Sequence, residues 1–504
     1  MKKLFVLLLI YVSALLGSDK IEKWDYFELT LKGPDTGNPF TEVEITAVFK
    51  NGNKQIEVNG FYSGGGEYKV RFMPTTLGVW RYKTQSNKKQ LSGKKGQFEC
   101  MIQTEDNHGL VQVDKKTHFN YSDGTSYYPF GTTCYAWTNQ PDSVQEYTLE
   151  TLKKSPFNKL RMCVLPKNQH GHDMPEPKMY PFVGSPSEGW DFSHFNAEYF
   201  QNLENRILQL RDLNIECDLI LFHPYDDGRW GFDQMTMSQS EFYIEYLIAR
   251  FSAFRHIWWS AANEYDLCKN KNDEDWDRIL KIIQEEDKYQ HLRSIHNWNN
   301  IYDATKPLVT HASIQKIPFR MRDLIKQFNK PVIIDECGYE GNIQFTWGDL
   351  TPQTMTQKFW MAVINGGYAS HGETYVNVAN TRWWAQGGLL EGKSIARIQF
   401  LKEIIYDLPE NGLVEMNASP TKWNRLNSVK LNDDYFLFYF EDRQHCERFI
   451  ELPENKKYKI EIIDTWDMTI EELEGVFSGE TRVPLPTKPY MALRVRSVDT
   501  FKNE

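Results

Sequence analysis

The sequence is poor in cysteine, with seven in 504 residues, and none of them forms a Cys-x-x-Cys pair. Domains built on disulfides and structural zinc sites need more or closely paired cysteines, so this scarcity argues against both. The sequence also lacks any run of lysine and arginine long enough to follow a phosphate backbone, and its formal net charge is -10 with a pI near 5.7. We therefore expect no nucleic-acid partner.

Long apolar runs are also missing beyond the N-terminus, so we expect no transmembrane span, which needs about 20 apolar residues. The first residues follow a different pattern: Lys2 and Lys3 precede a mostly apolar run, Leu4 to Leu16, that ends at Gly17. This order is typical of a secretory signal peptide covering residues 1–17, with an uncleaved anchor as the alternative. We expect an exported protein, periplasmic or extracellular.

The remaining composition, with 40% hydrophobic and 25% charged residues, is that of a globular protein. At 504 residues the chain has room for several domains. The unusual figure is 14% aromatic residues, comprising 15 Trp, 26 Tyr and 30 Phe. Such side chains fill cores, and their flat faces also suit stacking against sugar rings.

The patterning along the chain predicts three domains after the signal peptide. Residues 18–104 alternate apolar and polar in short runs such as Phe27–Leu31 and Tyr68–Phe72, which predicts a β-sandwich. The segment Glu67–Trp80 resembles immunoglobulin-like modules that precede barrels in some bacterial glycan-degrading enzymes. The alternation returns in residues 410–504, which predicts a second β-sandwich.

Between them, residues 105–409 contain apolar runs separated by helical patterns. Eight strands alternating with helices favour a (β/α)8 barrel, and the absence of a Gly-rich phosphate loop disfavours the competing open doubly wound sheet. The predicted strands are Tyr128–Tyr135, Lys159–Leu165, Glu216–Phe222, His256–Ala262, Arg293–His296, Leu308–His311, Val332–Ile334 and Tyr368–Val376.

Two carboxylates follow strands of this predicted barrel. Glu264 comes after the fourth strand and Glu336 after the seventh. Because barrel active sites form at the C-terminal ends of the strands, we expect the two side chains to converge. Paired carboxylates are what hydrolysis of a glycosidic bond requires.

The surrounding residues carry a family resemblance. Asn263-Glu264, Glu336, the Arg161 of Phe157–Met162, His223 and His311 occur in the strand order of the clan A retaining glycoside hydrolases, and the pattern is most similar to family 5 and the apiosidase-like barrels. The resemblance implies Glu264 as general acid and base, Glu336 as nucleophile, Asn263 as a donor to the sugar 2-hydroxyl, and Arg161 as a clamp that keeps Glu336 ionised. It implies a poly- or oligosaccharide substrate and no cofactor.

Four tryptophans are candidates for stacking on that substrate: Trp137, Trp347, Trp383 and Trp384. Each follows a predicted strand, and core or domain-interface packing is the equal alternative for each. The sequence specifies neither the sugar nor the number of subunits.

Two other functions compete with the glycosidase. His170, His172 and Asp173 could hold a metal, but the sequence has neither a His-x-His on the first strand nor an H-E-x-x-H motif, so we expect no metal site. A non-catalytic carbohydrate-binding barrel is the alternative from a different class.

Overall fold

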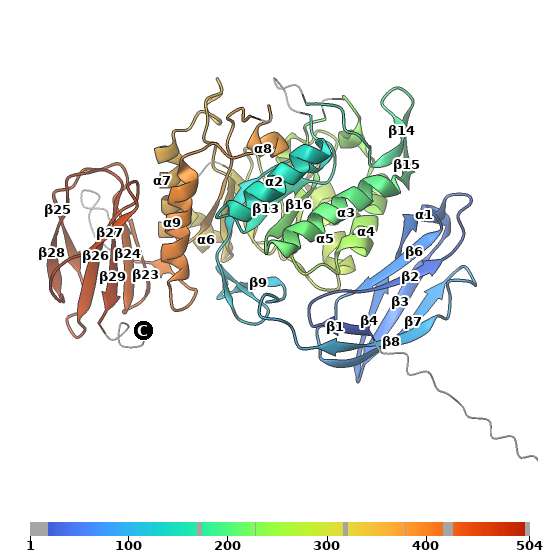
Figure 1. Cartoon of the computed structure of the whole chain (residues 1–504), viewed down its shortest axis with the longest axis horizontal. Helices are drawn as coiled ribbons and strands as arrows, with labels where there is room; N and C mark the ends of the chain where they lie inside the picture. Colours follow the sequence, from blue (N-terminus) through green and yellow to red (C-terminus); the bar gives the residue numbers. More distant parts are fainter. Residues whose placement is uncertain are drawn as a thin grey trace, which may run out of the picture.

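The computed structural model describes residues 19–168, 174–226, 228–315, 321–378, 380–416 and 427–498. Within these ranges a central barrel carries one β-domain at each end of the long axis of the molecule (Figure 1). No helix in them is long and apolar enough to cross a membrane. The predicted signal peptide lies outside the described residues.

The N-terminal domain is a sandwich of a five-stranded sheet, in the order β1-β8-β7-β3-β4, and a three-stranded sheet, β2-β6-β5. Buried and exposed side chains alternate along its strands because one face of each sheet packs on a shared core. Phe49 and Phe72 stack across this core with ring centroids 4.2 Å apart. The elements are β1 Asp19–Glu22, β2 Phe27–Lys32, α1 Pro39–Glu42, β3 Ile45–Asn51, β4 Lys54–Asn59, β5 Phe61–Gly64, β6 Glu67–Phe72, β7 Gly78–Ser86 and β8 Lys95–Met101.

Eight parallel strands form the barrel, in the order β18-β17-β16-β13-β12-β21-β20-β19, and a parallel bridge between His296 and Ser313 joins the two end strands. This confirms the predicted (β/α)8 fold. The strands are β12 Phe130–Thr133, β13 Lys159–Cys163, β16 Glu216–Phe222, β17 Ile257–Ala262, β18 Arg293–Ser294, β19 Ala312–Gln315, β20 Val332–Glu336 and β21 Tyr368–His371.

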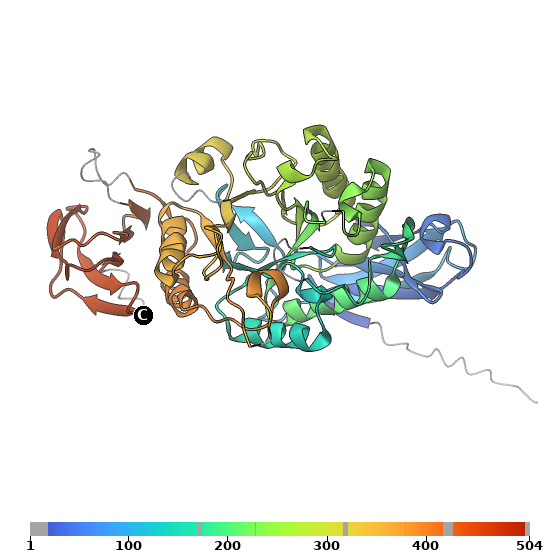
Figure 2. The ribbon, with the colours of Figure 1, turned by 90° about the horizontal axis from the view of Figure 1, so that it is seen from above.

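Helices surround these strands, as the view from above shows (Figure 2). They are α2 Asp142–Lys154, α3 Ala197–Asp212, α4 Met237–Phe251, α5 Asp273–Glu286, α6 Met321–Phe328, α7 Pro352–Ile364, α8 Trp383–Gln386 and α9 Ser394–Tyr406. Side chains cap several of them: Asn196 accepts from the first turn of α3, and Thr236 forms a capping box on α4. A hairpin of β14 Phe182–Ser185 and β15 Gly189–Phe195 is inserted before α3.

The sixth strand was predicted wrongly. The apolar run Leu308–His311 precedes the strand, which is Ala312–Gln315. Its polar residues, Ser313 and Gln315, alternate with Ala312 and Ile314 and face a polar interior: the Ser313 hydroxyl donates to the Asp335 carboxylate at 2.6 Å. The apolar pattern therefore identifies the segment before the strand instead of the strand.

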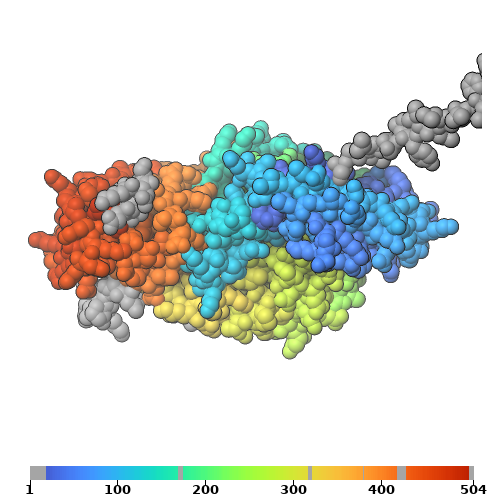
Figure 3. Space-filling model, turned by 90° about the horizontal axis from the view of Figure 1, so that it is seen from below, coloured from blue at the N-terminus to red at the C-terminus, as the bar shows by residue number. Residues whose placement is uncertain are grey.

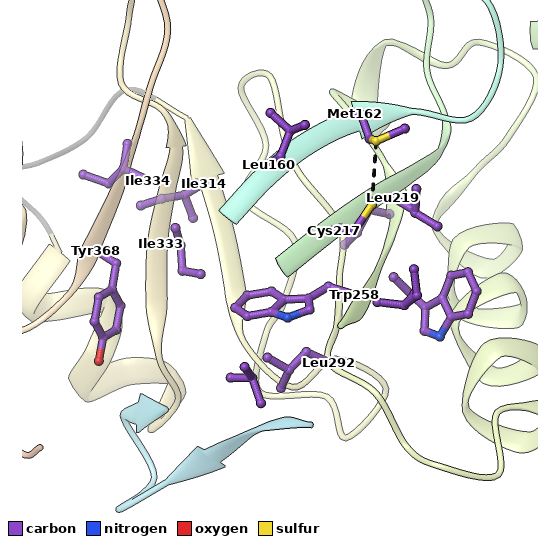
Figure 4. Packing of buried hydrophobic residues seen from close by; sticks show 14 of the residues in the cluster. Leu160, Met162, Cys217, Leu219, Trp258, Leu292, Ile314, Ile333, Ile334 and Tyr368 are labelled. Carbon is purple, nitrogen blue, oxygen red and sulfur yellow. Dashed lines mark hydrogen bonds between the residues drawn. The ribbon is translucent and has the colours of Figure 1, made fainter. Parts of the chain in front are cut away.

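A small sheet closes the N-terminal end of the barrel. It consists of β9 Val111–Asp114, β10 His118–Tyr121 and β11 Ser126–Tyr127. Phe119 of this sheet packs against Trp258 of β17, with ring centroids 5.5 Å apart. Figure 4 shows Trp258 above these strands, and it shows Met162 of β13 in contact with Cys217 of β16. Seen from below, this segment and the N-terminal sandwich cover that side of the barrel (Figure 3).

The C-terminal domain has a six-stranded sheet, β22-β23-β24-β29-β26-β27, and a two-stranded sheet, β25-β28. It contacts the barrel through α7, where Trp360 stacks on Tyr439 with ring centroids 5.3 Å apart. Its strands are β22 Val414–Glu415, β23 Asn427–Asn432, β24 Tyr435–Tyr439, β25 Glu447–Glu451, β26 Tyr458–Asp464, β27 Thr469–Glu472, β28 Glu480–Pro484 and β29 Met491–Ser497. All seven cysteines are free, and only Cys446 is exposed.

A buried ion cluster joins the N-terminal sandwich to the barrel. Arg71 of β6 donates to both oxygens of Glu204 on α3, at 2.7 and 2.9 Å, and to the backbone carbonyl of Arg250 on α4. Arg250 also binds Glu204 at 2.8 Å, and Glu28 binds Arg71 from the sandwich side. Because Arg71 and Glu204 are both buried, each depends on the other for its charge partner.

The substitution Arg71→Met should destabilise the protein by about 3 to 5 kcal/mol, because it leaves buried carboxylates short of a cation. Thermal and urea unfolding would measure the loss. The matched control is Lys32→Met, which removes a surface pair with Glu67 whose side chains are 72% and 40% exposed; it should change stability by less than about 1 kcal/mol. Equal effects of the two substitutions would contradict the prediction.

Candidate active site

The two glutamates singled out by the sequence lie together at the C-terminal end of the barrel. Glu336 is the last residue of β20, and Glu264 follows β17 with a left-handed backbone conformation, φ 48°. Both are largely buried, with 4% of Glu264 and 7% of Glu336 exposed. They line a cavity of about 630 Å³ together with six aromatic side chains, which are Tyr135, Tyr225, Trp298, Tyr339, Trp347 and Trp384.

Gln315, the last residue of β19, bridges the two glutamates. Its Nε2 donates to Glu264 Oε1 at 2.6 Å and to Glu336 Oε2 at 2.7 Å. The two carboxylate oxygens are therefore separated by no more than the sum of these distances. Such a gap matches the roughly 5 to 5.5 Å of glycosidases that retain configuration, and it is shorter than the roughly 6.5 to 9.5 Å of inverting ones.

Neutral donors surround Glu336. The hydroxyl of Tyr135 contacts its Oε1, and Asn263 Nδ2 lies 3.3 Å from the same oxygen. Burial raises the pKa of Glu336 to about 8, and a hydrogen bond with Tyr339 lowers it. The carboxylate is held by hydrogen bonds from uncharged groups.

Arg161 was expected to bind Glu336, but in the structure it binds other residues. Arg161 directs its guanidinium to Asn263 Oδ1 at 2.6 Å and to Asp218 and Asp335 at 3.4 Å. Arg161 lies in the middle of β13, so its side chain meets these acidic groups inside the barrel rather than Glu336 at the strand ends. Arg161 therefore orients Asn263, and Asn263 in turn contacts Glu336.

Arg161 belongs to a charged cluster inside the barrel. Lys159 donates to Asp218 at 2.6 Å and to Asp335 at 2.8 Å, and the side chains of all four charged residues are 0% exposed. Burial alone would raise the pKa of Asp335, but Lys159 and Arg161 hold it well below its ordinary value. The four residues form a fully paired cluster beneath the cavity floor.

Asn263 connects the charged cluster to the cavity wall. Arg161 binds its amide oxygen, so its amide nitrogen must face the opposite way, toward Tyr225 Oη at 2.9 Å and Glu336. His223, predicted as a substrate contact, lies behind Tyr225 with 4% exposure, and its Nδ1 accepts from the Tyr225 backbone N–H at 3.3 Å. His223 supports the wall and does not line the cavity.

His311 is also misplaced in the prediction. Because the sixth strand begins one residue later than His311, this side chain lies at the N-terminal end of the barrel, opposite the cavity. Its ring contacts Phe119 and Trp258 at centroid distances of 5.8 and 5.4 Å. The residue of this strand that lines the cavity is its last, Gln315.

The four tryptophans divide evenly. Trp347 and Trp384 line the cavity with ring centroids 5.5 Å apart. Trp137 and Trp383 are fully buried: Trp137 Nε1 contacts Met162 Sδ, and Trp383 Nε1 donates to Thr132 Oγ1 at 2.8 Å. Core packing therefore explains Trp137 and Trp383, because both rings lie inside the wall rather than at its surface.

Two buried glutamates fasten the wall that carries Trp384 and Tyr339. Glu373 accepts from the backbone N–H groups of residues 391 and 392, and Glu340 accepts from those of residues 393 and 394 at the start of α9. The Trp384 backbone N–H donates to the Glu373 carbonyl at 3.2 Å. Burial raises the pKa of Glu373 to about 8. These carboxylates lie outside the cavity lining and hold its backbone.

The structure also identifies cavity residues that sequence reasoning missed: Gln315, Lys167, Tyr135, Tyr225 and Tyr339. Lys167 and the three tyrosines lie in loops that follow barrel strands, whereas Gln315 is the last residue of its strand. Listing the polar residues beyond each strand end would have found the other four, but Gln315 was missed because the sequence patterns did not predict its strand.

The described residues contain no group of three or more His, Cys, Asp or Glu side chains that could hold a metal ion. The candidate cluster of His170, His172 and Asp173 lies outside the described residues.

The comparisons with known proteins agree with this geometry. Residues 113–409 match the family described as apiosidase-like, catalytic domain. Residues 20–87 and 423–496 match two domains of unknown function, DUF5060 and DUF5605. No curated protein matches the chain.

Among solved structures, a candidate glycoside hydrolase from Bacteroides vulgatus is 40% identical with a TM-score of 0.89, over 95% of this chain and 100% of that one. A glycoside hydrolase family 5 protein from the same organism is 17% identical with a TM-score of 0.61, over 77% and 94% of the two chains, and it shows the shared fold. The chain therefore belongs to the apiosidase-like family, and it is a glycoside hydrolase built on the (β/α)8 barrel of clan A.

Proposed function

We propose that the protein hydrolyses O-glycosidic bonds of a poly- or oligosaccharide by double displacement, with Glu336 as nucleophile and Glu264 as acid and base. The observation that carries the proposal is the Gln315 amide, which binds both carboxylates at 2.6 and 2.7 Å. A gap this short leaves no room for a water molecule between an inverting base and the sugar. It suits direct attack by one carboxylate on the anomeric carbon.

In the first step Glu264 protonates the leaving oxygen while Glu336 attacks the anomeric carbon, which forms a glycosyl ester. In the second step Glu264, now ionised, takes a proton from water, and that water displaces Glu336 and restores both groups. Gln315 donates to an oxygen of each carboxylate and holds the two groups in place. Asn263, next to Glu336 Oε1, is placed to donate to the neighbouring sugar hydroxyl.

The substitution Glu264→Gln should lower kcat/KM about 100- to 10,000-fold by removing acid-base catalysis, and Glu336→Gly should abolish turnover. With azide and an activated glycoside, the Glu336→Gly variant should yield a glycosyl azide of inverted configuration, and Glu264→Ala one of retained configuration. Nuclear magnetic resonance of the products distinguishes them.

Glu285→Gln, on the exposed surface of α5, is the matched control and should leave activity unchanged. A wild-type product of inverted configuration would refute the nucleophile. Full activity of both site variants would refute the enzyme site, and glycan binding without turnover in the wild type would favour the non-catalytic alternative.

The raised pKa of Glu336 predicts the pH profile. Attack requires the ionised carboxylate, so kcat/KM should rise with pH through about 8, the pKa of Glu336. The hydrogen bond with Tyr339 lowers that pKa, so Tyr339→Phe should move this limb to higher pH by roughly one unit. Tyr62→Phe, which removes a hydroxyl from the N-terminal sandwich, should leave the limb in place. A shift to lower pH in Tyr339→Phe would contradict the assignment.

We also propose that the protein is exported. Lys2, Lys3 and the apolar run Leu4–Leu16 support this. Expression in a bacterial host should give a periplasmic or secreted product whose N-terminal sequence begins just after Gly17. Recovery of the intact N-terminus in the cytoplasm would contradict the proposal, and deletion of residues 1–17 provides the control that stays inside the cell.

A further inference from the structure

Lys167 places a positive charge in the cavity. It lies in the loop after β13, is 4% exposed, and lines the cavity beside both glutamates. Its Nζ is 3.9 Å from the ring centroid of Tyr135 and 4.1 Å from that of Tyr225, and Trp384 lies 5.4 Å away. Three aromatic faces thus hold the ammonium in one position, which is favourable for a cation over π systems.

No carboxylate of the described residues lies within ion-pair distance of the Lys167 ammonium, and Glu264 attracts it only from farther away. In the part of the chain that the structure describes, Nζ makes neither a hydrogen bond nor an ion pair, and its contacts are the three rings. Lys159, equally buried, binds two carboxylates at 2.6 and 2.8 Å. Buried charges are normally paired, because water no longer solvates them. Burial lowers the pKa of Lys167 to about 8, so the group is still mainly cationic at neutral pH.

We propose that Lys167 determines specificity by binding an anionic substituent of the substrate, a uronic acid carboxylate or a sulfate ester. The inference rests on the proposed glycosidase function and adds a substrate class to it. An ammonium is a point charge with three donors, so it binds either anion, and the substrate supplies the partner that the described residues do not provide.

The position of Lys167 tells where the anion lies. Tyr135, whose ring contacts Nζ, touches Glu336 with its hydroxyl, and Tyr225, on the other side, is bound to Asn263. One tyrosine ring therefore separates the ammonium from the nucleophile. The substituent belongs to the sugar at the cleavage point or to its direct neighbour.

Charge elsewhere in the cavity supports a single anion position. Its described lining carries Asp233, Glu264 and Glu336, while Lys269 is exposed at the rim. Any of these acidic groups that is ionised repels a substrate anion, and none of them attracts one. The buried ammonium of Lys167 is the group in the cavity that attracts an anion. Because the acidic substituent must lie beside it, the ammonium also fixes the orientation of the sugar.

The test compares glycans with and without their charge. Polygalacturonate and glucuronoxylan supply carboxylates, chondroitin sulfate supplies both carboxylate and sulfate, carrageenan supplies sulfate esters, and galactomannan and arabinogalactan provide largely neutral chains. Each acidic glycan is also used after carboxyl reduction or desulfation. The wild type should cleave at least one acidic glycan, and removal of the charge should lower kcat/KM about 10- to 100-fold, the range of a charge-assisted hydrogen bond.

Lys167→Met should cleave the charged and uncharged forms at the same low rate, because it keeps the apolar length and removes the charge. Its melting temperature should not fall, since an unpaired buried charge is lost. The wild-type KM for the acidic glycan should rise above pH about 8 as Lys167 loses its proton, and the KM of the variant should not. Lys281→Met on the exposed face of α5 is the control and should behave as the wild type.

The outcomes separate the two proposals. Cleavage of neutral glycans alone, or an equal loss in Lys167→Met for charged and uncharged forms, overturns the role of Lys167 and leaves the glycosidase intact. Cleavage of no glycan contradicts the proposed function, and this inference with it. If carboxyl reduction of the glycan lowers the rate, the bound anion is a carboxylate. If desulfation lowers the rate, it is a sulfate ester.

Discussion

The structure of the cavity depends on the charged cluster of Lys159, Arg161, Asp218 and Asp335 inside the barrel. Four ions with no exposed surface are costly to desolvate, and they are tolerated because each has an opposite partner and because Ser313 and Ser370 donate to Asp335. One donor of the cluster, Arg161 Nη2, is directed outward and binds Asn263. That contact decides which way the Asn263 amide faces, and with it the contacts of the amide nitrogen to Tyr225 and Glu336.

This arrangement separates charge from catalysis. The cations of the barrel interior pair with Asp218 and Asp335, while Glu336 is bound by two tyrosines and two amides. In the proposed mechanism, a guanidinium beside Glu336 would stabilise its charge strongly and make the carboxylate a weaker nucleophile. Neutral donors leave its pKa raised, at about 8, so less of its reactivity is lost. The scaffold and the reacting group thus use different kinds of interaction.

Much of this was predictable from sequence, and the exceptions share a cause. Period-two and helical patterns identified the barrel, and the rule that polar residues follow strands found Glu264 and Glu336. The patterns failed at Ala312–Gln315, where the strand faces ions rather than apolar side chains. They also could not tell Trp383, buried, from its neighbour Trp384, which lines the cavity, because the difference lies in the turn of a four-residue helix. The contacts of Arg161 likewise depend on how deep its side chain lies in the barrel. The sequence does not show that it reaches Asp335 rather than the adjacent Glu336.

The Gln315 amide has a consequence for the catalytic cycle as a whole. In the proposed double displacement the negative charge would move from one glutamate to the other and back, and a linkage that relied on charge would tighten and loosen at each step. An uncharged amide can donate to a carboxyl group in either protonation state, since each retains an acceptor oxygen. In that mechanism Gln315 would act as a spacer of constant length: the proton, the sugar and the water would change places, while the distance between the two carboxyl groups would stay the same.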